Sequence, residues 1–259
     1  MFGEVGSGKS SIINMIVGQT VAEVSMGIVQ GTLQPERHEV SIDGTCFNVY
    51  DTVGLNEGEQ GRVPHWKAVH QLYTLIRTLD DVSLLVYCIR GRINESARAD
   101  WTLFSKILCD KKVPIIAVET GLEEEEDFDR KRTLLKETLE RDGMVPGGVE
   151  CVVSIRGRKN EHEERYNSSQ RQLRRLIMRS FRREPWSMTT DDWIGHIYKT
   201  TYTTKLWFFP DVRVEFAKEV GNLIDEFIEE TGMKKDEAEK LKSTLLDAER
   251  KLRKKLSFR

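Results

Sequence analysis

Short, almost continuous apolar runs alternate with amphipathic segments along most of the chain. Apolar runs of this kind are typical of parallel strands that are buried on both faces, and they cover residues 82–89, 113–118 and 149–154. Between and around them, apolar residues recur three and four positions apart, which predicts helices at residues 9–17, 65–79, 95–109, 128–141 and 163–181. Alternating strands and helices predict an α/β fold with a mostly parallel sheet and helices on both faces.

A different periodicity occupies residues 38–50. Two short segments, 38–42 and 46–50, each alternate apolar and polar residues, and Asp43-Gly44 separates them. An Asp-Gly pair between two alternating runs is a strong hairpin signal, because this turn needs residues that accept positive φ. The sequence therefore predicts an antiparallel hairpin, with polar, glycine-containing loops at 18–35 before it and 51–64 after it.

The pattern changes near Arg182. Aromatic residues crowd into positions 186–209, and apolar residues at helical spacing then fill 214–230 and 236–256, with a turn near Thr231-Gly232. We therefore predict two parts. Residues 1–181 form the α/β domain, and residues 182–259 form a C-terminal, mainly helical extension made of an aromatic segment and a helical hairpin.

The first candidate site lies near the amino end of the sequence. Gly3-Glu4-Val5-Gly6-Ser7-Gly8-Lys9-Ser10 matches G-x-x-x-x-G-K-[ST], the phosphate-binding loop. Its glycines let backbone N–H groups point at phosphate oxygens, its lysine adds positive charge, and its serine hydroxyl suits Mg²⁺. The following helix adds the positive end of its dipole. We predict phosphate contacts from Gly3, Glu4, Val5, Gly6, Ser7, Gly8, Lys9, Ser10 and Ser11; a Gly/Ser-rich turn before a helix is the alternative.

Only Met1 and Phe2 precede this loop, although in this architecture the loop follows a buried strand. Phe2 is predicted to be the last residue of that strand, and the rest of the N-terminal strand is missing. We expect a truncated start. A real short form would keep an open slot between strands, which makes its independent stability doubtful.

Two more residues are candidate ligands of a metal ion together with Ser10. Asp51-Thr52-Val53-Gly54 follows the second hairpin segment; Asp51 would reach Mg²⁺ through water and the Gly54 N–H would contact a γ-phosphate. Thr32 lies in the 18–35 loop and is expected to close over the same metal, with Thr20 as its rival. The predicted metal set is therefore Ser10, Thr32 and Asp51.

The phosphate loop, the hairpin and the D-x-x-G segment together resemble a Ras-like P-loop GTPase domain of the TRAFAC class. The runs at 51–55 and 118–123 also resemble septin-like, immunity-associated GTPases, and most of all a group of fungal G-domain proteins. The resemblance covers about residues 1–181. It implies that GTP or GDP is bound with Mg²⁺ as cofactor, and that the protein is a molecular switch with slow turnover.

The base-recognition motif departs from the family pattern [NT]-K-x-D. The corresponding residues are Thr120-Gly121-Leu122-Glu123, so glycine replaces the lysine and glutamate replaces the aspartate. The resemblance implies that Thr120 and Glu123 belong to the base site and that Ser154 contacts the base oxygen through its backbone. An acidic helix start is the alternative for Glu123, and an ordinary strand end is the alternative for Ser154. ATP binding therefore stays open.

The catalytic residue is not identified by the sequence. Leu55 stands where Ras-like GTPases have the glutamine that orients the attacking water, and a leucine side chain cannot hydrogen-bond water. Gln60, further along the same loop, is a substitute candidate. We therefore expect a GTPase with a low intrinsic rate; a hydrolysis-deficient, nucleotide-dependent assembly module is the alternative.

The composition limits the partners and the cellular location that we expect. The chain is 32% charged with a net charge of −2, which gives no general attraction to nucleic acid. Its four cysteines show no metal-like spacing, so buried reduced thiols are expected, and no apolar run is long enough to span a bilayer. We expect a cytoplasmic protein without nucleic-acid or membrane partners. A second protomer or an effector protein would contact the 18–35 and 51–64 loops.

Overall fold

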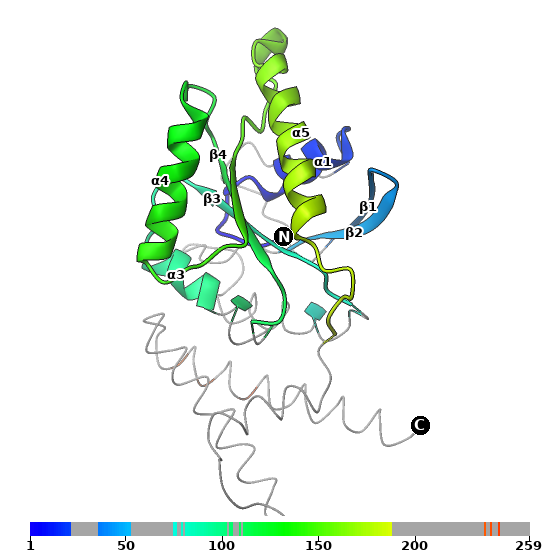
Figure 1. Ribbon diagram of the computed structural model, residues 1–259, viewed down its shortest axis with the longest axis vertical. Helices are drawn as coiled ribbons and strands as arrows, with labels where there is room; N and C mark the ends of the chain where they lie inside the picture. Colours follow the sequence, from blue (N-terminus) through cyan, green and yellow to red (C-terminus); the bar gives the residue numbers. More distant parts are fainter. Residues whose placement is uncertain are drawn as a thin grey trace, which may run out of the picture.

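The chain folds as the alternating pattern predicts. The computed structural model describes residues 1–21, 36–52, 75–76, 79, 81–102, 104–105, 109, 111–187, 236, 239 and 243. The order of elements in these ranges is α1 (Lys9–Val17), β1 (Glu36–Ile42), β2 (Thr45–Asp51), β3 (Leu85–Arg90), α3 (Glu95–Thr102), β4 (Ile115–Thr120), α4 (Phe128–Arg141), β5 (Gly148–Cys151), a 3₁₀ turn at Arg158–Asn160 and α5 (Glu163–Ser180) (Figure 1). The expected helices at 65–79, 214–230 and 236–256 lie almost wholly outside the described residues.

Within the described ranges, the strands form two small sheets. One is parallel, in the order β3-β4-β5, with Leu85 opposite Ile115 and Ile116 opposite Gly148. Its central strand, β4, is buried along its whole length, as a strand covered on both faces must be. The other sheet is the antiparallel hairpin of β1 and β2. The hairpin turn is Asp43 and Gly44, with φ of 48° and 81°, as this turn requires.

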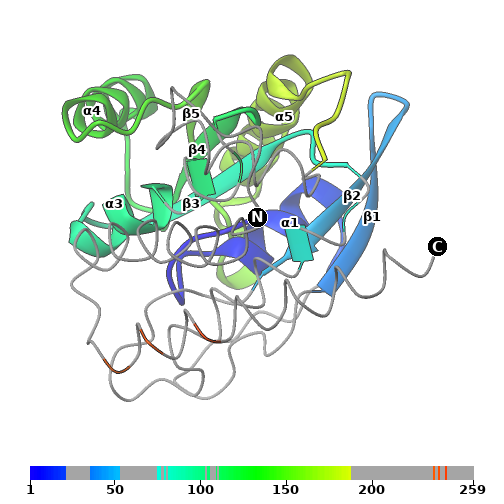
Figure 2. The same ribbon diagram turned by 90° about the horizontal axis from the view of Figure 1, so that it is seen from below.

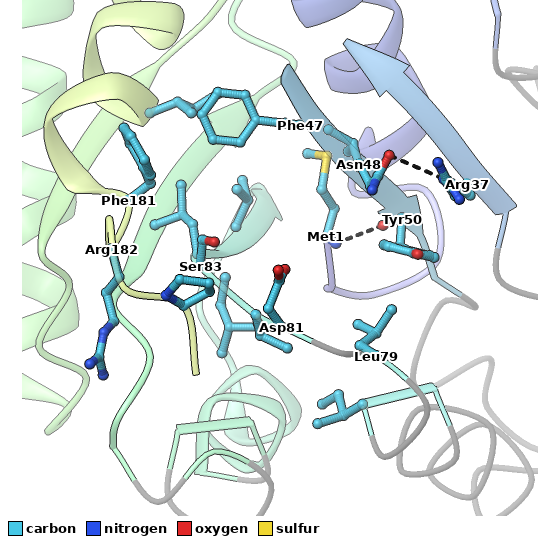
Figure 3. A pocket seen from close by; sticks show the side chains of 18 of the residues that line it. Met1, Arg37, Phe47, Asn48, Tyr50, Leu79, Asp81, Ser83, Phe181 and Arg182 are labelled. Atoms are coloured by element: carbon cyan, nitrogen blue, oxygen red, sulfur yellow. Dashed lines mark hydrogen bonds between the residues drawn. The ribbon is translucent and has the colours of Figure 1, made fainter. Parts of the chain in front are cut away.

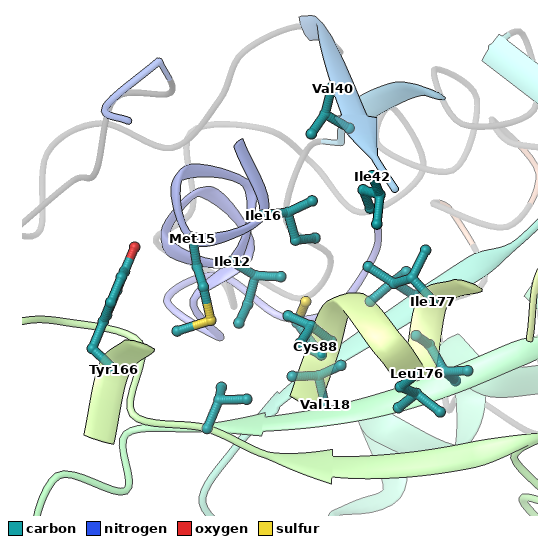
Figure 4. Packing of buried hydrophobic residues seen from close by; sticks show 14 residues of the cluster. Ile12, Met15, Ile16, Val40, Ile42, Cys88, Val118, Tyr166, Leu176 and Ile177 are labelled. Carbon is teal, nitrogen blue, oxygen red and sulfur yellow. The ribbon is translucent and has the colours of Figure 1, made fainter. Parts of the chain in front are cut away.

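Helices cover both faces of the parallel sheet. Helices α1 and α5 lie against one face beside the hairpin, and α3 and α4 lie on the other side (Figures 1 and 2). On the first face, a cluster of buried apolar side chains from both helices meets the hairpin and the parallel strands (Figure 4). Its buried members include Ile12, Met15, Ile16, Val40, Ile42, Val118, Leu176 and Ile177. This packing holds the start of α1, and therefore the phosphate loop, against the sheet.

Phe2 connects the two sheets. It pairs in parallel with Tyr87, since its N–H donates to the Val86 carbonyl and its carbonyl accepts from the Cys88 N–H, both at 2.9 Å. The Met1 amino group donates to the Tyr50 carbonyl of β2 at 2.7 Å. Phe2 thus has the strand position that the sequence predicts for it.

A cavity of about 450 Å³ lies beyond Met1, where β2 and the approach to β3 diverge (Figure 3). Its lining includes Phe47 and Tyr50 of β2, Ser83 before β3, and Phe181 after α5. The Phe47 and Phe181 rings meet edge to face at 5.1 Å between centroids.

The expectation of buried thiols holds for three of the four cysteines and is wrong for Cys46. Cys88, Cys109 and Cys151 are buried, and burial raises the pKa of each thiol to about 12. Cys46 is exposed because it alternates with Phe47 along β2 and points away from the core. No disulfide joins these cysteines.

An ion pair between a buried carboxylate and a partly exposed lysine crosses from β4 to α4. Glu119 is 4% exposed, and its Oε1 lies 3.0 Å from Nζ of Lys131. Burial raises the pKa of Glu119 above the ordinary value of 4.5, while the hydrogen bond from Lys131 opposes that shift. Burial is the larger effect, so ionised Glu119 is less favourable in the folded protein than in the unfolded chain.

The raised pKa of Glu119 gives a pH-dependent prediction. A group with a raised folded-state pKa contributes stability below its unfolded-state pKa and loses that contribution as pH rises through the folded-state value. We therefore expect the unfolding free energy of Glu119→Gln to rise relative to wild type between about pH 5 and about pH 7.5. Urea unfolding at the two pH values measures this, with the exposed Glu137→Gln as control. A pH-independent offset, as from leaving Lys131 without its carboxylate, contradicts it.

Candidate functional site

The phosphate loop has a positive φ at three positions, a backbone that favours glycine. Gly3, Gly6 and Gly8 have φ of 144°, 74° and 88°. A Cβ on Gly3 would lie 2.3 Å from the Cys88 carbonyl oxygen, and one on Gly8 would lie 2.8 Å from Oγ1 of Thr120. The loop therefore packs against β3 at Cys88 and against the end of β4 at Thr120, and helix α1 starts at Lys9, directly after Gly8.

Lys9 folds back across this loop. Its Nζ donates to the backbone carbonyls of Gly3 at 3.1 Å and Glu4 at 3.0 Å, and the residue is only 7% exposed. Nearby, the Ser7 hydroxyl is buried without a hydrogen-bond partner among the described residues. A held ammonium group and an unsatisfied hydroxyl at a helix N-terminus are suited to an anion.

Ser10 and Asp51, two of the three predicted metal ligands, are hydrogen-bonded to each other. The Ser10 hydroxyl donates to Oδ2 of Asp51 at 2.6 Å, and Asp51 is 2% exposed. Its other oxygen, Oδ1, is buried and has no hydrogen-bond partner within the described part of the chain. A buried carboxylate oxygen without a partner is costly unless a cation or a donor satisfies it. Oxygen donors of this kind suit Mg²⁺.

The protein side of such a metal site is incomplete within the described residues. No group of three or more His, Cys, Asp or Glu side chains gathers there. An ion bound between Ser10 and Asp51 would therefore take further ligands from water and from a bound phosphate, which is the usual arrangement for Mg²⁺. The third predicted ligand, Thr32, lies outside the described residues, as do Gly54, Leu55 and Gln60.

The expected base-binding residues lie at the carboxyl ends of neighbouring strands. Thr120 ends β4, and its hydroxyl donates to the Ser7 carbonyl at 2.9 Å, so this strand end is tied to the phosphate loop. Glu123 follows in the next loop and is partly exposed, while Ser154 follows β5 and is buried. Ligands of open α/β sheets bind at this edge.

Arg165 of α5 fixes the backbone of the loop that carries Glu123. Its guanidinium donates to the carbonyls of Leu122 at 3.4 Å, of Glu123 and of Glu125, and it lies over the Phe128 ring at 5.3 Å. The loop carbonyls thus point at α5. This role has no local signal in the sequence, because the contacting residues lie about forty positions apart.

Two other residues near the phosphate loop escaped the sequence analysis. Asn94 caps the start of α3 by accepting from the Ala97 N–H at 2.8 Å, and its amide donates to Oε1 of Glu4 at 3.1 Å. Its place just before a helix is a readable capping signal. The other residue is Arg90, at the end of β3, whose side chain lies beside Gly121. Within the phosphate loop itself, the Val5 side chain points to solvent and is 45% exposed, so it does not anchor the loop to the sheet.

Comparisons with known proteins found one family model and several solved structures that resemble this chain. Residues 1–120 match the family model described as 50S ribosome-binding GTPase. Among solved structures, a dimerization-deficient mutant of Toc33 from Arabidopsis thaliana is 19% identical with a TM-score of 0.52, and the match covers 72% of this chain and 85% of that one. No curated protein matches this chain.

Two structures of Era are also similar. One, a complex with MgGDPNP and a segment of 16S ribosomal RNA, is 14% identical with a TM-score of 0.51, over 88% of this chain and 65% of that chain. The other, an Aquifex aeolicus Era variant bound to GDP·AlF₄⁻, is 14% identical with a TM-score of 0.50, over 76% and 64%. The fold is therefore that of a P-loop GTPase G domain, which confirms the predicted α/β fold class.

No helix within the described ranges is both long and apolar enough to cross a membrane.

Proposed function

We propose that this protein binds GTP and GDP with Mg²⁺ and acts as a GTPase switch with a low intrinsic rate. One observation carries the proposal: Lys9 and the Ser10–Asp51 pair stand at the N-terminus of α1, beside a loop whose backbone requires glycine. The phosphate groups of a nucleoside triphosphate fit this place, because a positive charge, a helix dipole and a pair of possible ligands for a divalent ion lie together there.

Each half of the site has its own task under this proposal. Lys9 exchanges its two backbone carbonyls for phosphate oxygens, and the loop N–H groups donate hydrogen bonds to the remaining phosphate oxygens. Ser10 and Asp51 hold Mg²⁺, which would neutralise the phosphates; Thr32 joins them from the 18–35 loop. On the base side, Glu123 receives the guanine N–H groups and Ser154 meets the base oxygen.

Hydrolysis is proposed to be slow because Leu55 replaces the residue that orients water. A group supplied by a partner accelerates other GTPases by roughly 10³ to 10⁵. We propose that a second protomer or an effector protein reads the 18–35 and 51–64 loops, and that the protein works in the cytoplasm. The alternative, a hydrolysis-deficient assembly module, is favoured by the same Leu55.

Competition for a fluorescent GDP derivative tests the proposal on the full chain. GTP is expected to displace the probe at roughly 100-fold lower concentration than ATP, because Glu123 can accept two hydrogen bonds only from guanine. Chelating Mg²⁺ is expected to weaken GTP binding by about tenfold or more in wild type and far less in Asp51→Asn. Asp43→Asn, at the exposed hairpin turn, is the matched control.

The outcomes separate the candidate functions. Equal displacement by GTP and ATP would assign an ATP-binding or unselective protein, and no binding of any nucleotide would reject the proposal. Single-turnover hydrolysis at low and high protein concentration then distinguishes the switch from the assembly module. A rate indistinguishable from that of free GTP at both concentrations favours the module.

A further inference from the structure

Gly121 stands where the guanine-binding motif has its lysine, and the space beside it is filled by another residue. Gly121 has φ of 77°, and a Cβ built on it would lie 2.8 Å from Nε of Arg90 and 3.3 Å from its Cγ. The Arg90 side chain therefore runs directly alongside the Gly121 backbone. A lysine at position 121 would meet both backbone strain and this arginine.

Strand pairing explains how Arg90 reaches this place. Arg90 is the last residue of β3 and lies opposite Thr120 in the parallel register of β3 and β4. Gly121 is the next residue along, so the two strand ends place Arg90 beside it. Thr120 is also bonded to Ser7 in the phosphate loop. Arg90 thus lies at the edge of the sheet that carries both the phosphate loop and Glu123.

The guanidinium of Arg90 is exposed and available to contact a ligand. Arg90 is the one exposed residue of β3, whose other residues are all buried. Within the described part of the chain, no hydrogen bond or ion pair engages its guanidinium. A planar, weakly hydrated guanidinium stacks well on an aromatic face.

We infer that Arg90 covers one face of the bound purine, in the role that a lysine at position 121 would otherwise take. The inference rests on the proposed function and adds a residue to the same site. Every base has a π-face, so a stacked guanidinium contributes affinity for guanine and adenine nucleotides alike. Arg90 therefore supplies affinity for the base, and Glu123 supplies the choice between bases.

The test compares ligands with and without a base. Arg90→Ala is expected to raise the Kd for GDP and GTP by about tenfold, and the Kd for ATP by a similar factor, while competition by inorganic tripolyphosphate stays unchanged. Arg90→Lys keeps a cation on an apolar stem and is expected to lose about threefold or less. Arg175→Ala, which removes an exposed arginine from α5, is the matched control, and circular dichroism melting verifies folding.

Three results would overturn the inference. If Arg90→Ala weakens the binding of tripolyphosphate as much as the binding of GDP, Arg90 is a phosphate ligand. If the loss appears only at protein concentrations where light scattering shows a dimer, Arg90 acts on the nucleotide of a second copy. If Arg90→Ala binds GDP like wild type while Lys9→Ala does not bind it, this inference fails and the proposed function stands. If wild type and Lys9→Ala instead bind nucleotide equally well, the result contradicts the proposed function itself.

Discussion

Replacing Lys9 with alanine is expected to raise the Kd for GTP and GDP by about 100-fold or more. The ammonium group lies within the loop, 3.1 Å and 3.0 Å from two backbone carbonyl oxygens, and is nearly buried. Charge-assisted hydrogen bonds contribute about 1.5–3 kcal/mol each. Losing close to 3 kcal/mol corresponds to roughly a 100-fold change in affinity. Titration with a fluorescent GDP derivative measures the change.

Two further variants make the Lys9 result interpretable. Lys136→Ala removes an exposed lysine from α4 and is expected to bind like wild type. Lys9→Arg keeps the charge in a larger, planar group and is expected to bind weakly, since the space between the Gly3 and Glu4 carbonyls holds a compact ammonium. Retention of nucleotide by Lys9→Ala at the wild-type level, with a normal melting curve, would contradict the phosphate-loop interpretation.

Helix boundaries were predictable where a local signal marks them. The expected helix 128–141 is observed as α4 with the same ends. Asp127 caps its start by accepting from the Arg130 N–H at 2.9 Å, and Gly143 takes φ of 75° just after its end. An aspartate just before a helix and a glycine just after it are local signals of its two ends, so these boundaries depend little on tertiary contacts.

Strand boundaries needed partners that the sequence does not show. The apolar run 82–89 predicts a strand from Val82, but β3 starts at Leu85. Val82 pairs instead with Trp186, its N–H donating to the Trp186 carbonyl at 2.6 Å. The run 149–154 similarly extends beyond β5, which ends at Cys151. Apolar periodicity reports burial, whereas strand ends depend on which distant backbone is adjacent.

The difference between local signals and contacts of distant segments also explains which site residues were predicted and which were missed. The phosphate loop is one contiguous motif, and Asp51 belongs to a second short motif at a predicted strand end, so their meeting was foreseeable. Arg90 contacts Gly121 only through the register of two strands thirty residues apart in sequence, and Arg165 reaches Glu123 from another helix. Such residues carry no local pattern, because topology alone decides what they contact.

Phe2→Ala is expected to lower the unfolding free energy by about 3–5 kcal/mol. Phe2 is 1% exposed, and its ring stacks on Phe104 and Tyr87 at centroid distances of 3.8 Å and 4.8 Å. A loss of this size is a large part of the roughly 5–15 kcal/mol that stabilises a typical domain. Urea unfolding followed by circular dichroism measures it, with Leu134→Ala on the exposed face of α4 as control.

The consequence of Phe2→Ala should extend to the phosphate loop, because Gly3 follows directly and packs on the Cys88 carbonyl. The main-chain bonds from Phe2 to Val86 and Cys88 do not need the ring, so the variant separates ring packing from strand pairing. Phe2→Leu restores most of the buried volume and is expected to recover more than half of the lost stability. If Phe2→Ala unfolds at the same urea concentration as Leu134→Ala, ring packing at Phe2 does not hold the two sheets together.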